Sequence, residues 1–307
     1  MGRSVNGIFL WGTGHPDLAG KIDFSRLSDL PAPWSEDLRL REPWRKTVLP
    51  LEGPASDCRV SGKRTDAPVI FVAGACASAM PLAWHFAAMD CLPEGGSVIC
   101  TSQLQGKGQR GRGWVSPPGN LYAALRIPEA PPAFSGMMSL VIGYAVIRAL
   151  QELELPARLK WPNDVMLGGK KAGGILIQNR RGISVAGVGL NLVSAPDPAS
   201  LRAAHAVPAT HLEAAGHRTT PLSLWERLVD RIGFFMRALY GAGVPTAIGR
   251  IQAQMEFVDQ AVRVDDHAGR IYSAVLLGLS EDGGLMLKVE NETRTIRSGS
   301  ITPLPAL

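Results

Sequence analysis

The chain has 307 residues, of which 46% are hydrophobic and 19% charged, a balance that excludes a disordered chain and predicts a sizeable buried core. Its formal net charge of +5 is modest and scattered, which indicates attraction to anionic ligands rather than general nucleic-acid binding. The four cysteines, Cys58, Cys76, Cys91 and Cys100, show no CxxC pairing and no histidine at metal-ligand spacing, which disfavours a zinc site.

Residues 1–66 are expected to form an irregular N-terminal extension. Prolines and glycines interrupt them, as in PAPW at 31–34 and EPWRK at 42–46, and no helical or strand periodicity is sustained. A helix-turn-helix that reads DNA needs two or three amphipathic helices, and this stretch offers no pattern for them. No secretory signal and no uninterrupted membrane-spanning run is recognised. We therefore expect a cytoplasmic protein with neither a membrane nor a nucleic-acid partner.

From Pro68 the pattern changes to a strand, a helix and a second strand. VIFVAG begins at Val69, an apolar helical run extends over 78–89, and SVICTS begins at Ser97; such short apolar runs bounded by glycines predict buried strands. Small and branched apolar residues then recur at helical spacing from about 135 to 153. Further strands are predicted at 121–126, 158–161, 172–179 and 183–192.

The carboxyl-terminal part combines a surface segment, a helix and several short strands. Residues 194–221 are rich in Ala, Pro and His and are expected to run over the surface. An amphipathic helix follows to about Tyr240. From Gln260 onward short strands alternate with turns, which predicts a small SH3-like β-barrel. The alternation of these elements around one sheet predicts an α/β or α+β fold. The expected organisation is the extension at 1–66, a main domain at 67–255 and the SH3-like domain at 256–307.

One motif is a glycine-rich basic loop. GKGQRGRGW at Gly106 to Trp114 places four glycines and three cations in nine residues. This composition suits a flexible loop that closes over an anion. The alternative is an ordinary solvated basic loop.

A second motif, LKWPNDVMLGGKKAGGIL, lies at 159–176. Lys171 follows a glycine pair, and a lysine there can lie against a carboxylate or phosphate while glycines let a ligand approach the backbone. The alternatives are an exposed turn lysine and, for Asn163 and Asp164, a turn that bonds its own backbone.

Together these motifs resemble those of biotin protein ligases, and the resemblance runs from about Pro68 to the carboxyl end. It implies an α+β fold, in which a class II synthetase-like, biotin/lipoate ligase catalytic domain with a mixed sheet is followed by the SH3-like domain. It also implies that Lys171, Arg110 and Arg112 stabilise charge when the biotin carboxylate meets the α-phosphate of ATP. The positions implied for biotin or its adenylate are Ser78, Gln103, Gly106, Lys107, Gly108, Gln109, Trp114, Gly174 and Gly187.

The resemblance also implies the nucleotide, the ion and the protein partner. The strand end at 187–191 is similar to the family's Gly-x-Gly-x-Asn segment, whose asparagine faces ATP. The implied small molecules are biotin as substrate and ATP with Mg2+, without protein ligands assigned to the metal. The implied partner is the biotin carboxyl carrier protein of a biotin-dependent carboxylase, and a homodimer stays open. The positions implied for ATP are Lys160, Trp161, Asn163, Asp164 and Asn191.

The sequence departs from the family pattern in two places. Where members commonly have Ser-Thr-Asn, this chain has Ser78, Ala79 and Met80, and each polar partner lost from a buried ureido group costs about 1 to 3 kcal/mol. Lys107 and Gln109 stand where arginines are usual, which predicts a weaker hold on the adenylate phosphate.

These departures leave three alternatives. One is a ligase of the same fold that acts on lipoate or octanoate. Another is a regulatory paralogue that binds biotin or its adenylate without efficient transfer. The third, a repressor that binds DNA, is disfavoured because no reading helix is recognised.

Overall fold

The computed structural model describes residues 6–48, 57–63, 65, 68–197, 207–266 and 268–304. The chain divides into two compact units: the first comprises residues up to 129, 174–195 and 211–233, and the second comprises 130–173, 196–210 and 234–307. The units interleave along the sequence, and the expected division at 67–255 and 256–307 stays a prediction.

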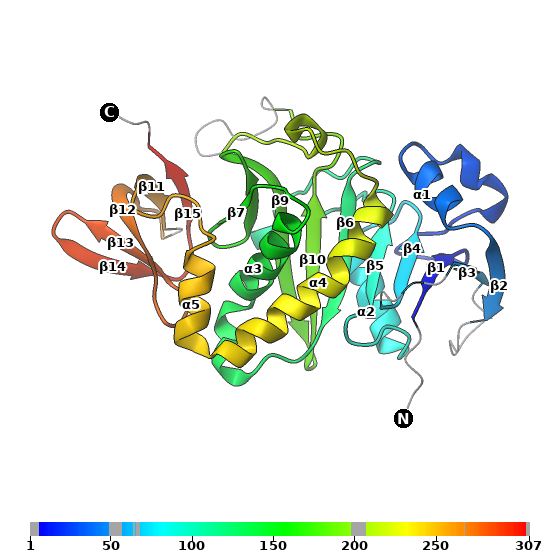
Figure 1. Cartoon of the computed structure of the whole chain (residues 1–307), viewed down its shortest axis with the longest axis horizontal. Coiled ribbons are helices and arrows are strands. Elements are labelled where there is room, and N and C mark those ends of the chain that lie inside the picture. Colours follow the sequence, from blue (N-terminus) through cyan, green and yellow to red (C-terminus); the bar gives the residue numbers. More distant parts are fainter. Residues whose placement is uncertain are drawn as a thin grey trace. The chain divides into compact units, whose positions relative to one another are not determined.

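The first unit is built on a mixed sheet whose strands run in the order β2-β3-β1-β4-β5-β6-β10-β9. β1 pairs in parallel with β4, and β4 with β5, whereas β1 with β3, β2 with β3, β5 with β6 and β6 with β10 pair in an antiparallel manner. The neighbours β4, β5, β6 and β10 are visible side by side (Figure 1). The strands are β1 (Ile8–Trp11), β2 (Trp44–Val48), β3 (Asp57–Ser61), β4 (Ile70–Ala73), β5 (Ser97–Cys100), β6 (Leu121–Ile127), β9 (Lys170–Arg180) and β10 (Ile183–Leu190).

Helix α2 (Ala79–Ala88) covers part of this sheet and contacts β5, β6 and β10. The rings of Phe71 and Phe86 stack with centroids 4.4 Å apart, and Trp11 meets Phe86 edge-on. Such contacts place the core between α2 and the sheet. The predicted strand, helix and strand between Val69 and Ser102 are confirmed.

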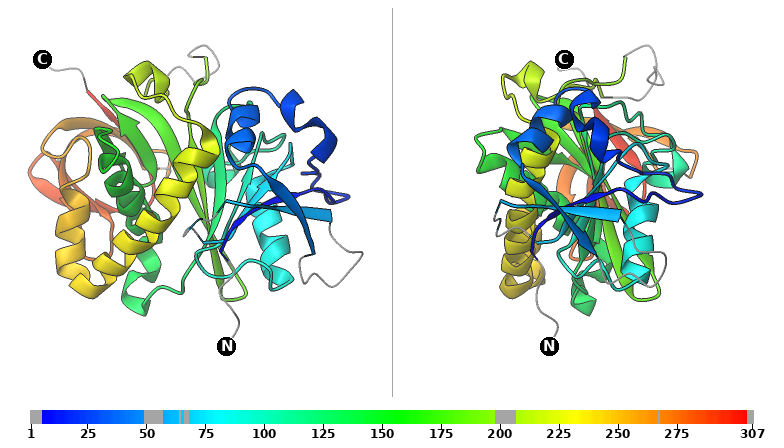
Figure 2. Two further views of the ribbon diagram at one scale, coloured as in Figure 1. Left: turned by 45° about the vertical axis from the view of Figure 1, so that its right-hand side comes forward. Right: turned by 90° about the vertical axis from the view of Figure 1, so that its right-hand side faces the viewer.

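The expectation that residues 1–66 are irregular is wrong for their described part. β1, β2 and β3 extend the main sheet (Figure 2), with Phe9 opposite both Val60 and Phe71. A 3-10 turn η1 (Phe24–Asp29) and a helix α1 (Trp34–Leu40) lie between β1 and β2. Each element has only four to seven residues, too few for a periodic pattern to emerge.

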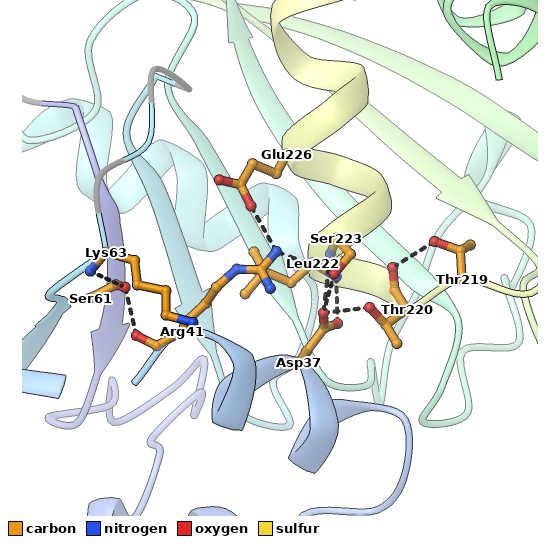
Figure 3. A network of polar contacts seen from close by, with 9 residues as sticks. All are labelled: Asp37, Arg41, Ser61, Lys63, Thr219, Thr220, Leu222, Ser223 and Glu226. Carbon is orange, nitrogen blue, oxygen red and sulfur yellow. Dashed lines mark hydrogen bonds and ion pairs between the residues drawn. The ribbon is translucent and has the colours of Figure 1, made fainter. Parts of the chain in front are cut away.

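The N-terminal segment also caps the long helix α4 (Pro221–Ala242). The carboxylate of Asp37 accepts from the amides of Leu222 at 2.8 Å and Ser223 at 3.2 Å, and from the Thr220 hydroxyl at 2.5 Å (Figure 3). The first amides of a helix lack partners within it, so a carboxylate there stabilises the helix. Burial raises the pKa of Asp37, and these hydrogen bonds oppose the rise.

The second unit contains a buried helix and a small β-structure. Helix α3 (Met138–Gln151) follows a 3-10 turn η3 (Pro132–Met137), and eleven of its fourteen residues are buried. The span Pro132–Gln151 is long and apolar enough to cross a membrane, yet 72% of its most apolar stretch is buried inside the protein, as in a core helix. β7 (Ala157–Lys160) pairs with β8 (Asp164–Leu167), and α5 (Val244–Gln252) follows α4. Neither β8 nor α5 was expected.

The carboxyl-terminal strands form a separate antiparallel sheet in the order β14-β13-β12-β11-β15. Burial alternates along β11 and β12, as expected where one face covers a core. The α+β fold with a mixed main sheet and an SH3-like carboxyl-terminal sheet is confirmed. The strands are β11 (Ala261–Asp265), β12 (Ile271–Leu279), β13 (Leu285–Val289), β14 (Glu292–Ile296) and β15 (Ser300–Pro303).

Candidate functional site

A chain of polar side chains lies in the first unit, beside the loop that follows β4. We call residues 74–79 the pocket loop. The side-chain oxygen of Gln103 (Oε1) accepts from the Ser78 hydroxyl at 3.0 Å and from the Ala79 backbone amide at 2.9 Å. Its amide group donates to the Ser116 hydroxyl at 2.9 Å. The structure thus brings Ser78 and Gln103 together and adds Ser116, which the sequence did not single out.

The glycine-rich loop folds back on itself directly after this cluster. The Trp114 amide donates to the Gly106 carbonyl at 2.8 Å, and the Gly108 amide to the Arg112 carbonyl at 2.7 Å. A Cβ on Gly106 would lie 2.5 Å from the Trp114 carbonyl oxygen, so only glycine fits there. Lys107, Arg110 and Arg112 are exposed, which leaves these three cations accessible to an anion from solution.

Two glycines of β10 are covered by side chains of this chain. A Cβ on Gly187 would lie 2.9 Å from the Met80 sulfur, and one on Gly189 would lie 3.0 Å from the Trp114 ring. Glycine in a strand often marks such a close approach. Met80 is 7% exposed and belongs to the core cluster against which Trp114 packs. The faces of Gly187 and Gly189 that were expected to meet a ligand are therefore covered by a thioether and an indole.

The second unit holds the charged part of the predicted site. The two carboxylate oxygens of Asp164 each meet a lysine ammonium: Lys160 at 2.7 Å and Lys171 at 2.5 Å. Burial alone would raise the pKa of Asp164, but the two ammonium groups outweigh burial and hold this pKa at about 2. The Lys160 side chain is 8% exposed and that of Lys171 is 32% exposed. Lys171 is therefore the lysine of this pair that solvent and ligands can reach.

Backbone pairing fixes Lys171 near the start of β9. Its amide donates to the Pro208 carbonyl at 2.8 Å, and its carbonyl accepts from the Thr210 amide at 2.8 Å. The segment 194–221, which was expected to run over the surface, thus pairs with β9 through Pro208 and Thr210. Its residues 198–206 lie outside the described part. Trp161 is 2% exposed, and its indole donates to the Gly283 carbonyl at 3.2 Å, which ties it to the turn between β12 and β13.

Asn191 and the residues around it close the end of β10 in the first unit. Asn191 is buried, and its carbonyl accepts from the Leu212 amide at 3.0 Å. The neighbouring Asn120, absent from the predictions, accepts from the amides of Leu192 at 2.8 Å and Val193 at 3.1 Å. A buried asparagine with these partners fixes the backbone after Asn191. Its only sequence signal is a polar residue directly before an apolar strand.

The predicted residues thus form two groups, one in each compact unit. Of the remaining predicted positions, Gln109 and Gly174 are half-buried in the first unit and Asn163 is half-buried in the second. The described residues contain no cluster of three or more His, Cys, Asp or Glu side chains able to hold a metal ion. The first-unit group comprises Ser78, Gln103, Gly106, Trp114, Gly187 and Asn191, and the second-unit group comprises Lys160, Trp161, Asp164 and Lys171.

Comparison with known proteins relates the chain to a family of ligases. Residues 75–192 match the biotin/lipoate A/B protein ligase family. A biotin--[acetyl-CoA-carboxylase] ligase of Paracoccus denitrificans is 31% identical over 45% of this chain and 65% of its own length. One of Mycobacterium tuberculosis is 28% identical over 69% of this chain and 80% of its own. The biotin protein ligase of Aquifex aeolicus, solved with biotin and ATP, is 25% identical over 76% of this chain and 97% of its own, with a TM-score of 0.64.

Over residues 75–192 the chain is therefore similar to the biotin/lipoate A/B protein ligase family, and its fold is similar to that of a biotin protein ligase. The relatives named above are biotin ligases, so the similarity is to this branch of the family. The resemblance noted in the sequence is confirmed.

Proposed function

We propose that this protein is an ATP-dependent ligase that activates biotin and attaches it to a lysine of a biotin carboxyl carrier protein, in the cytoplasm. The observation that carries the proposal is Lys171, held by a buried Asp164 yet 32% exposed, within the region that matches the family. The names of the relatives support biotin as the acid, and the Aquifex aeolicus complex supports ATP as the second substrate.

The first reaction joins two anions. A carboxylate oxygen of biotin attacks the α-phosphorus of ATP, the bond from that phosphorus to the β-phosphate bridging oxygen breaks, and pyrophosphate leaves. The approach is opposed by charge repulsion unless cations lie nearby. Lys171 and the exposed Arg110 and Arg112 are the cations proposed for this task.

The second reaction transfers the acyl group. The uncharged ε-amine of the carrier lysine attacks the acyl carbon of biotinyl-5'-AMP, the carbon–oxygen bond to AMP breaks, and the amine loses a proton as the amide forms. No covalent bond to this protein is required. Its residues act by positioning and by stabilising charge.

Mg2+ belongs to the proposal only as the ion that accompanies ATP. The described residues offer no cluster of carboxylates to hold it, and both oxygens of Asp164 already meet lysines. Mg2+ commonly keeps several waters and binds through substrate phosphates. No step is therefore assigned to protein-held metal.

One observation favours lipoate or octanoate as an alternative acid substrate: the apolar side chain of Met80 lies against Gly187. An apolar wall suits the alkyl chain of lipoate or octanoate better than a ureido ring. ATP–pyrophosphate exchange, measured separately with biotin, lipoate and octanoate, tests the choice. Exchange that depends on biotin supports the proposal, and exchange only with lipoate or octanoate would assign the protein to the related activity.

A further inference from the structure

Residues 14–20, here called the N-terminal turn, lie directly beside the pocket loop in the first unit. They belong to the extension that precedes the region matched to the family at 75–192. Ala19 and Cys76 form a bridge between the two segments. Three backbone hydrogen bonds join them: Gly74 amide to Gly20 carbonyl at 2.7 Å, Gly20 amide to Ala75 carbonyl at 3.0 Å, and Ala77 amide to Leu18 carbonyl at 2.9 Å.

The pocket loop is held on its other side by the segment that carries Gln103. Cys76 is bridged to Gln103, and the Gln105 amide donates to the Ala77 carbonyl at 2.9 Å. The pocket loop is therefore the middle of three hydrogen-bonded segments. The bonds from Ser78 and Ala79 to Gln103 depend on the position of this middle segment.

The fit between the N-terminal turn and the pocket loop leaves little freedom. A Cβ on Gly74 would collide with the Lys21 carbonyl oxygen, so the two backbones are in close contact. The turn is closed by two backbone hydrogen bonds between His15 and Ala19, at 2.8 and 3.0 Å. Leu18 packs against the core cluster that includes Met80. The turn is thus anchored to the pocket loop by its backbone and to the core cluster by the Leu18 side chain.

We propose that the N-terminal turn is a positioning element for the acid-binding pocket. It fixes the pocket loop so that Ser78 and Gln103 present their polar groups to the carboxylic acid substrate. This inference rests on the proposed function for the identity of the acid. Loosening the turn therefore raises the KM for biotin and leaves the KM for ATP unchanged.

Ala19 allows a test that leaves the core untouched, because its side chain is exposed and its φ is 57°. Valine is strained at positive φ, whereas glycine is not. Ala19→Val therefore disturbs the turn and Ala19→Gly preserves it. Glu154→Val is the matched control, since Glu154 is also exposed, has φ 62° and belongs to the second unit.

The experiment measures ATP–pyrophosphate exchange at varied biotin and varied ATP. We expect Ala19→Val to raise the KM for biotin roughly tenfold, as for the loss of about one well-aligned hydrogen bond, with the KM for ATP unchanged. Ala19→Gly and Glu154→Val should leave both values near wild type. An unchanged KM for biotin in Ala19→Val, or an equal rise in Glu154→Val, would overturn the inference.

Hydrogen exchange of the free protein provides a readout independent of activity. The Ala77 amide, which donates to Leu18, should exchange faster in Ala19→Val than in wild type, Ala19→Gly or Glu154→Val. Unchanged exchange at Ala77 would overturn the inference even if biotin reacts. If wild-type protein gives no ATP–pyrophosphate exchange with biotin, the proposed function is refuted instead. Hydrogen exchange at the Ala77 amide would still decide whether the turn holds the pocket loop.

Discussion

Asp164 holds the Lys171 ammonium at 2.5 Å and leaves that lysine 32% exposed. The second oxygen of Asp164 is taken by the nearly buried Lys160. Two cations around one carboxylate leave one positive charge in excess, and Lys171 carries the more accessible ammonium. This arrangement leaves a fixed positive charge accessible from solvent, and the proposed function assigns this charge to the meeting of the two anionic substrates.

Replacing Lys171 by alanine should impair adenylate formation. We expect kcat/KM for pyrophosphate exchange to fall roughly a hundredfold to a thousandfold, as when one preorganised donor to a developing charge is removed. Lys170→Ala is the control, because Lys170 is the exposed neighbour on the same strand and should change the rate less than about twofold. Equal effects of the two substitutions would contradict the role given to Lys171.

Asp164 should make stability fall in acid. Its pKa in the folded protein is about 2, below the ordinary 3.8, so the ionised form favours folding above pH 3.8 and this contribution is lost as the pH falls toward 2. This difference between the two pKa values corresponds to about 2 kcal/mol in the free energy of unfolding. Denaturant unfolding measured from about pH 5 to 2 should show a shallower loss in Asp164→Asn than in wild type.

The slope with pH, rather than absolute stability, is the readout for Asp164. Asp164→Asn leaves Lys160 buried without its counter-charge, which lowers stability at every pH. The same slope in both proteins would show that Asp164 is not held in its ionised form by the lysines.

Restoring the family's polar pair should strengthen biotin binding. Met80 covers Gly187 with a thioether, so the double substitution Ala79→Thr with Met80→Asn should lower the Kd for biotin roughly tenfold by supplying partners to the ureido group. Calorimetric titration measures this change. The double substitution Ala79→Thr with Met80→Leu keeps an apolar side chain at 80, and equal affinities in the two variants would refute the explanation.

An arginine at position 109 should slow the loss of the adenylate. Gln109 is half-buried in the glycine-rich loop, and a guanidinium there can donate two charge-assisted hydrogen bonds to a phosphate. Release of preformed biotinyl-5'-AMP, followed by rapid filtration, should be several-fold slower in Gln109→Arg. Gln109→Lys adds the charge without the planar fork and should have a smaller effect. An unchanged release rate in both variants would show that position 109 of this loop does not contribute to adenylate retention.

Much of the fold could be predicted because its central elements are apolar runs bounded by turn residues. β4 (Ile70–Ala73) and α3 (Met138–Gln151) are clear examples. β1 (Ile8–Trp11) was missed because four apolar residues carry no usable period. β8 was missed because its first residue, Asp164, belongs to a polar motif that was interpreted as a nucleotide-binding segment, with a turn as the alternative.

The candidate site was predictable where residues form local motifs, such as the glycine-rich loop and the segment around Lys171. It was not predictable where partners lie far apart in sequence. Ser116 meets Gln103 thirteen residues away, and Asn120 holds Leu192 seventy-two residues away. The contact of the N-terminal turn with the pocket loop likewise depends on the pairing of β1 with β4. No local sequence pattern predicts this pairing.

The most direct test of the account is the intact mass of a biotin carrier domain incubated with this protein, biotin, ATP and Mg2+. The proposed function predicts a mass gain of one biotinyl group on the carrier, absent without ATP and strongly reduced with Lys171→Ala. Binding of biotin without any gain in carrier mass would contradict it and would indicate a regulatory biotin-binding protein instead.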